Sequence, residues 1–166
     1  MQTKNLDMYG NAPIPWRRAQ EALAAGRGPG FTFFLGTVRP DGRPHAAGLG
    51  AIWVDEALWF VTGPGTRKAR NLAVNPLCTV SCRLSGLDVV LEGRAERVRD
   101  ADALERLAAV YRGEGWPAQV EGDAFTAPYS APSAGPPPWH LYRLDTDTAF
   151  GVATAEPFGA SRWRFS

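Results

Sequence analysis

A short run of hydroxyl and basic residues, Thr66-Arg67-Lys68, follows a glycine-rich turn and is the stretch best suited to chemistry. Thr66 is a good helix N-cap, so Arg67 and Lys68 are predicted to lie in the first turn of a helix. Cations at this end are unfavourable by roughly 0.3–1 kcal/mol each, because the helix dipole is positive there. A bound anion reverses that sign, since free N–H groups and both cations then face it. A phosphate monoester suits such a site; the alternative is a solvated basic helix start without a ligand.

The neighbouring elements place this run between a strand and a helix. Residues 58–62 are mostly apolar and are predicted to end a strand, which the turn Gly63-Pro64-Gly65 then terminates. A short helix is predicted over residues 66–73. It stops before Pro76, because proline disfavours the helical conformation in the residue that precedes it.

Length, composition and charge limit the class of protein. A chain of 166 residues with 45% hydrophobic and 21% charged residues predicts one globular domain spanning 1–166. A net charge of +1 disfavours a nucleic-acid partner, and no apolar run is long enough for a membrane span. The first eleven residues lack the apolar core of a signal peptide. We therefore expect a cytoplasmic protein.

Two cysteines, Cys78 and Cys82, lie on one predicted strand. They face the same side of it but are about 13 Å apart by strand rise, which is too far for a disulfide. Buried thiols are the expectation, and their spacing predicts no metal site. This agrees with a reducing compartment.

The rest of the chain predicts a strand-rich fold. Helices are predicted over 15–26 and 101–112, the second capped by Asp100; strands are predicted over 31–38, 45–54, 57–62, 77–84, 87–98 and 139–151. Turns are expected at Pro40-Asp41-Gly42 and at Asp55-Glu56. Closely spaced strands with tight turns favour a barrel over alternating strands and helices. Residues 113–138 are proline-rich and are predicted to form an irregular connection, either a plain surface segment or a lid over a pocket.

The run from Thr62 to Leu72 resembles the phosphate-binding segment of the pyridoxamine 5′-phosphate oxidase-like family, the flavin-binding split β-barrels. In that family a strand ends in Thr, and Ser/Thr-Arg-Lys opens a helix after a short turn. Two flanking segments, residues 37–45 and 88–98, follow the family order as well, so the likeness covers roughly 31–111. The resemblance implies a mainly β fold with flanking helices, a six-stranded antiparallel split β-barrel. It also implies a homodimer with the cofactor at the interface.

The resemblance further implies a cofactor, FMN or alternatively the deazaflavin coenzyme F-420. Its phosphate would be held at the helix start, and its ring would lie beside the strand at residues 47–52. The glycines of that strand fit close approach of a ligand, or equally a bulge or tight barrel corner. Late-chain residues often reach the cofactor of the other subunit in this family, so Trp163 is either a ligand contact or a core aromatic. The implied cofactor-binding residues are Thr62, Thr66, Arg67, Lys68, Asn71, Leu49, Gly50, Ala51 and Trp163.

The sequence departs from true pyridoxamine phosphate oxidases at two places. Ala47 stands where they carry a basic residue, and Arg162-Trp163-Arg164-Phe165 stands where they carry Arg-x-His. The resemblance therefore implies a flavin- or deazaflavin-dependent oxidoreductase acting on an unknown small molecule. The alternatives are a non-catalytic flavin, deazaflavin or haem-like binder, or a split barrel that has lost its ligand and serves as an interaction module.

No catalytic side chain is assigned, because the cofactor carries out the hydride chemistry. His45 and His140 are interpreted as polar strand positions, since neither lies at a metal-ligand spacing. Motifs of serine hydrolases and zinc peptidases are absent from the sequence. A longer cofactor tail would need further basic residues at the pocket mouth, for which the candidates are Arg17, Arg18, Arg39 and Arg43.

Overall fold

A computed structural model describes residues 1–25, 32–131 and 134–165. The strands are β1 (Gln2–Asn5), β2 (Phe33–Val38), β3 (Pro44–Leu49), β4 (Ala51–Val54), β5 (Ala57–Thr62), β6 (Leu77–Leu84), β7 (Leu87–Val98), β8 (Gln119–Glu121), β9 (Ala124–Thr126), β10 (His140–Ala153) and β11 (Ala160–Arg164). The helices are α1 (Trp16–Ala24), α2 (Arg67–Val74) and α3 (Ala101–Gly113). None of the described helices is long and apolar enough to cross a membrane.

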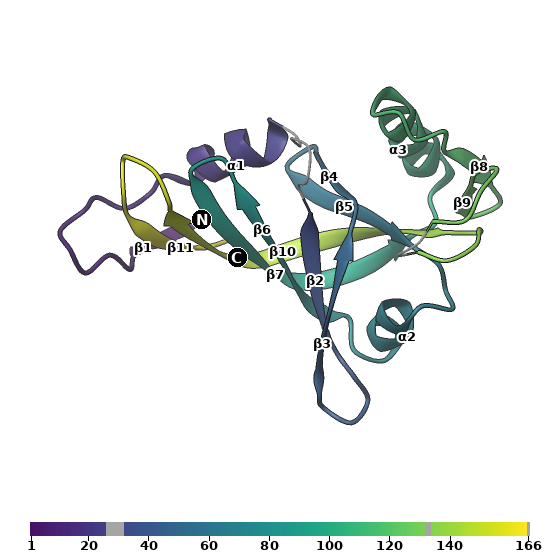
Figure 1. Cartoon of the computed structure of the whole chain (residues 1–166), viewed down its shortest axis with the longest axis horizontal. Helices are drawn as coiled ribbons and strands as arrows, with labels where there is room; N and C mark the ends of the chain where they lie inside the picture. The colour runs from purple at the N-terminus through teal and green to yellow at the C-terminus, as the bar shows by residue number, and fades with distance from the viewer. Residues whose placement is uncertain (26–31, 132–133, 166) are drawn as a thin grey trace.

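One strongly bent antiparallel sheet forms most of the molecule. Its order is β1-β11-β10-β7-β6-β2-β3, and β5 joins through β10 and pairs with β4. The long strands β7 and β10 run across the molecule, with β1 and β11 towards one end and α3 with the β8–β9 hairpin at the other (Figure 1). This is the mainly β split barrel with flanking helices that the sequence predicted.

A bulge bends the barrel where β7 meets β10. The register between these strands shifts between Thr146 and Thr148. Gly93 lies beside the bulge, and a Cβ there would stand 2.0 Å from the carbonyl oxygen of Asp145. Only glycine permits this close approach of two backbones.

The predicted strand over 45–54 is wrong as a single element, because the chain breaks it at Gly50. β3 pairs with β2, whereas β4 pairs with β5. The chain therefore changes partner strand at this residue. Of the alternatives considered for these glycines, this is the tight barrel corner. The Asp55-Glu56 turn that follows β4 is present, with φ values of 51° and 59° in the left-handed region.

The structure contains more strands than the six expected. β1 is short and exposed along its whole length, so it carries no alternating apolar signal. It pairs with β11, which lies in the C-terminal segment where no strand was predicted. The other predicted strands and helices are present with small shifts at their ends. The last residue of the helix predicted over 15–26 and the first residue of the strand predicted over 31–38 lie outside the described residues.

The connection at residues 113–138 is more ordered than predicted. It contains the β8–β9 hairpin, and Phe125 of β9 is fully buried beside Trp139 and Tyr111. Trp116 packs on the same group, with its ring centroid 5.4 Å from that of Trp139. Three-residue strands among prolines leave too short a pattern for sequence prediction, but the aromatic residues give the segment a small core of its own.

Candidate functional site

The turn between β5 and α2 is held by a chain of threonine hydrogen bonds. The hydroxyl oxygens of Thr62 and Thr66 lie 2.9 Å apart, and Thr66 donates to the carbonyl of Gly63 at 2.9 Å. Thr66 also accepts from the backbone N–H of Ala69 at 3.2 Å, so it caps the helix as predicted. The start of α2 is thereby fixed relative to the end of β5.

One flank of α2 carries buried polar side chains, which is unusual for so short a helix. Lys68 is 4% exposed and Asn71 is fully buried. The amide nitrogen of Asn71 donates to the hydroxyl of Thr37 on β2 at 2.9 Å. Its amide oxygen is buried and has no hydrogen-bond partner among the described residues. This bond ties α2 to the β2–β3 hairpin and leaves a free acceptor beside the basic residues.

Positive charge gathers on this side of the helix. His45 of β3 has its pKa lowered by burial and then by the positive charges of Arg39, Arg67 and Lys68. Each charged neighbour that shifts the His45 pKa is thus a cation. Burial also lowers the pKa of Lys68. A site with this electrostatic character favours an anion.

The proline-rich connection reaches the same turn. Gly63 donates its backbone N–H to the carbonyl oxygen of Ala134 at 3.0 Å. A Cβ on Gly63 would stand 2.2 Å from that oxygen, so the contact needs glycine. Residues 63–66 and 134–138 together line a cavity of about 310 Å³. The connection therefore forms one wall of a cavity beside Thr66.

The three residues predicted to lie along the ring form the corner between β3 and β4. Leu49 and Ala51 are buried, at 5% and 0% exposure, so their side chains belong to the core. Gly50 between them is exposed, and no atom would lie within 4 Å of a Cβ added there. Only backbone atoms of this corner are left to face a ligand.

Trp163 lies in the core and away from the threonine turn. Its side chain is fully buried, and the indole N–H donates to the carbonyl of Ile14 at 3.1 Å. Trp163 pairs with Ala149 of β10, while Thr62 pairs with His140. Those two β10 positions are separated by about 30 Å of strand. Within one chain the geometry favours the core alternative for Trp163.

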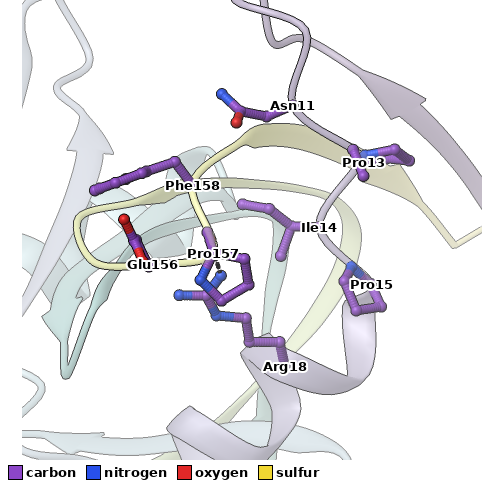
Figure 2. Close-up of a pocket in the computed structure, with 9 residues that line it drawn as sticks. Asn11, Pro13, Ile14, Pro15, Arg18, Glu156, Pro157 and Phe158 are labelled. Atoms are coloured by element: carbon purple, nitrogen blue, oxygen red, sulfur yellow. Dashed lines mark hydrogen bonds between the residues drawn. The ribbon is translucent and has the colours of Figure 1, made fainter.

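The four arginines considered for a longer cofactor tail have different surroundings. Arg17 pairs with Glu21 and Arg43 with Asp41, both at exposed positions. Arg18 points into a cavity of about 700 Å³ between the segment before α1 and the β10–β11 loop (Figure 2). Its guanidinium donates to the carbonyls of Pro157, Ala155 and Gly86 at 2.5, 3.1 and 3.2 Å. It therefore ties loops together.

Arg39 is the exception among these arginines, because its positive charge lowers the pKa of His45, as those of Arg67 and Lys68 do. Its Nε is buried without a hydrogen-bond partner among the described residues. Sequence reasoning did not assign Thr37 and His45 to the site. The available signal was the alternation of β2, which puts Thr37 on the same inward face as Phe33 and Leu35.

The chain belongs to the pyridoxamine 5′-phosphate oxidase family, which matches residues 20–153. A pyridoxine/pyridoxamine 5′-phosphate oxidase of Burkholderia multivorans is 30% identical, over 87% of this chain and 78% of that protein. The resemblance recognised in the sequence is thereby confirmed.

Solved structures agree on the fold. An FAD-binding protein from Mesorhizobium loti superposes with a TM-score of 0.56 at 19% identity, covering 98% of each chain. An F-420 reductase superposes with a TM-score of 0.52 at 21% identity, covering 78% of this chain and 94% of the other. At these identities the likeness is one of architecture.

Proposed function

We propose that this protein is an oxidoreductase that binds FMN, or alternatively the deazaflavin coenzyme F-420, with the cofactor phosphate at the start of α2. The proposal rests on the hydroxyl pair Thr62–Thr66 at the start of α2, where Arg67 and Lys68 follow. The positive charges of both residues and of Arg39 act on His45, which supports it. Charge-assisted bonds contribute roughly 1.5–3 kcal/mol each. Three or four of them supply much of a micromolar affinity, which corresponds to about −8 kcal/mol.

The residues present fit such a group. The hydroxyls, the helix N–H groups and the cations supply the donors that a phosphate needs, and the free amide oxygen of Asn71 offers an acceptor for a hydroxyl-bearing chain. The exposed backbone at Gly50 suits the approach of a flat ring. When bound, the cofactor supplies the hydride or electron transfer. The protein's own residues bind the phosphate, hold α2 against β2 and wall the cavity beside Thr66.

Family membership supports the same choice. Two solved structures of similar fold agree with it, since one is of an FAD-binding protein and the other of an F-420 reductase. The test is the visible spectrum of the purified protein, followed by fluorescence titration with FMN and with F-420. Preference for FMN or F-420 assigns the cofactor, and binding of neither contradicts the proposal. Turnover with a reductant and an acceptor then separates an enzyme from a non-catalytic carrier.

A double variant, Arg67→Ala with Lys68→Ala, tests the phosphate site directly. We expect cofactor binding to be lost while the circular dichroism spectrum stays unchanged, because both cations leave and the Thr66 cap remains. The control is Arg94→Ala, which removes a cation from an exposed position of β7. Unchanged affinity in the double variant would rule out this site.

We further propose that the active form is a homodimer with the cofactor between two copies. Phe34 of β2 is 51% exposed and Val38 is 36% exposed, so an apolar strip lies on the hairpin that also carries Thr37 and His45. A second copy on this strip would bury it and complete the site. Sedimentation of the loaded protein should give twice the chain mass, and a monomer would contradict the shared site.

A further inference from the structure

A second basic pocket lies on the other flank of α2 from Asn71. Arg70, Arg97, Arg99, His140 and Tyr142 line it, and we call these residues the arginine pocket. Its volume is about 330 Å³. Pro64 and the α2 residues Ala69, Arg70, Leu72 and Ala73 form the helix side, and residues of β7 and β10 form the floor.

Strand geometry brings the floor residues together. Arg97 lies in β7 and Arg99 directly follows the strand. Both side chains reach the carboxylate of Asp123, so they point to the same side. Arg97 pairs with Tyr142 across the antiparallel ladder, and His140 lies on the same face of β10. The arginine pocket is therefore built into the sheet.

Helix geometry separates this pocket from the proposed cofactor site. At 3.6 residues per turn, Ala69, Arg70 and Ala73 lie on one flank of α2, and Lys68 and Asn71 lie on the other. Asn71 faces the β2–β3 hairpin, as its bond to Thr37 shows, and the charge of Lys68 acts on His45 of the same hairpin. One helix thus separates two basic sites.

The arginine pocket carries more positive than negative charge. Arg97 and Arg99 share a single carboxylate, that of Asp123, at 2.8 and 3.1 Å. Arg70 has no ion-pair partner among the described residues, and the Nε of Arg97 is buried without a hydrogen-bond partner among them. His140 adds no negative charge; burial and then Arg97 are the largest causes that lower its pKa.

We propose that the arginine pocket binds the phosphoryl group of a small phosphate ester, separately from the cofactor. Three guanidiniums against one carboxylate leave an excess of about two positive charges, which matches a phosphate of about −1.5 to −2. Guanidinium groups bind phosphate oxygens with paired hydrogen bonds, so arginine suits this ligand better than lysine. The cavity is of a size found for small-molecule sites and leaves room for a few atoms beyond the phosphorus.

The experiment is calorimetric titration of the full chain with inorganic phosphate. We expect two sites per chain, of which Arg67→Ala with Lys68→Ala removes one. Arg70→Gln should weaken the other about tenfold or more, since a charge-assisted bond is lost. Because Arg70 is exposed on a helix surface, this variant should fold like the wild type. Arg99→Gln provides a second variant with the same expected loss.

The matched control is Arg94→Gln, which makes the same charge change on β7 but faces away from the pocket. Retained phosphate binding in Arg70→Gln and Arg99→Gln, or an equal loss in Arg94→Gln, overturns the proposal. If the proposed cofactor site at the start of α2 does not bind phosphate but the arginine pocket does, one phosphate binds per chain. Arg70→Gln then weakens that binding, whereas the Arg67→Ala, Lys68→Ala variant leaves it unchanged. The two proposals therefore fail in distinguishable ways.

Discussion

Lys68 is the buried cation of the proposed cofactor site. It is a cation at 4% exposure in the first turn of a helix, where both burial and the helix dipole oppose its charge. Burial accordingly lowers its pKa below the ordinary value of 10.5. A bound phosphate favours the charged form of Lys68, so binding of the anion and protonation of Lys68 favour each other.

Cofactor affinity should therefore weaken as the pH rises towards and above the lowered pKa of Lys68. Lys68 binds the phosphate only in its protonated form, and it loses that proton at a lower pH than an exposed lysine does. Lys68→Arg should remove this decline, because arginine stays charged. Dissociation constants from fluorescence titration across the alkaline range provide the measurement. Identical pH profiles for the wild type and Lys68→Arg would show that Lys68 does not contact the phosphate.

At the scale of elements, the turn before α2 joins three parts of the chain. β5 ends at Thr62, α2 begins at Arg67, and the proline-rich connection contacts the turn through Ala134. Gly63 makes that contact possible, whereas Gly65 has open space around the position of a Cβ. The two glycines of one turn thus have different structural roles.

Gly63→Ala should lower the free energy of unfolding by about 1–3 kcal/mol, because the methyl group would overlap the Ala134 carbonyl. It should also weaken cofactor binding, since the wall beside Thr66 must move. Gly65→Ala is the control in the same turn and should be neutral or stabilise by up to about 1 kcal/mol. Urea unfolding of both variants makes the comparison. Equal stability of the two would mean that the contact between the connection and the turn does not form.

At the scale of the whole molecule, the barrel interior holds two thiols in an apolar setting. Cys78 and Cys82 are free and buried on β6, which pairs with β7 and β2. Burial raises the pKa of Cys78 to about 11 and that of Cys82 to about 12, from an ordinary value of 9.0. Both thiols therefore stay protonated in the folded barrel over a pH range in which the thiols of an unfolded chain lose their protons.

The free energy of unfolding should therefore fall as the pH rises above about 9, because the unfolded state then binds fewer protons than the folded state. Urea midpoints measured at several values between about pH 8 and 10.5 test this, since the window spans the ordinary thiol pKa. Cys78→Ala with Cys82→Ala should give a shallower decline, although its stability at the low end of this range is lower because of lost packing. A decline of the same slope in the double variant would assign the effect to other groups.

Local sequence pattern by itself determined much of this protein. Thr66 as a cap, the stop at Pro76, the turn at Asp55-Glu56 and the alternation of β7 follow from the conformational preferences of neighbouring residues, so sequence predicts them. The resemblance to the family predicted two further features, the split barrel and the phosphate-binding segment.

Tertiary structure alone decided which residues far apart in the chain meet. Thr37 binds Asn71, the β3–β4 corner falls at Gly50, and Ala134 reaches Gly63, because strands choose partners through packing of the whole sheet. The arginine pocket likewise depends on the register between β7 and β10 and on the flank that α2 turns towards them. Such pairings between distant strands leave no periodic signal in one sequence, because the pattern fixes which face a side chain takes but not which strand lies beside it.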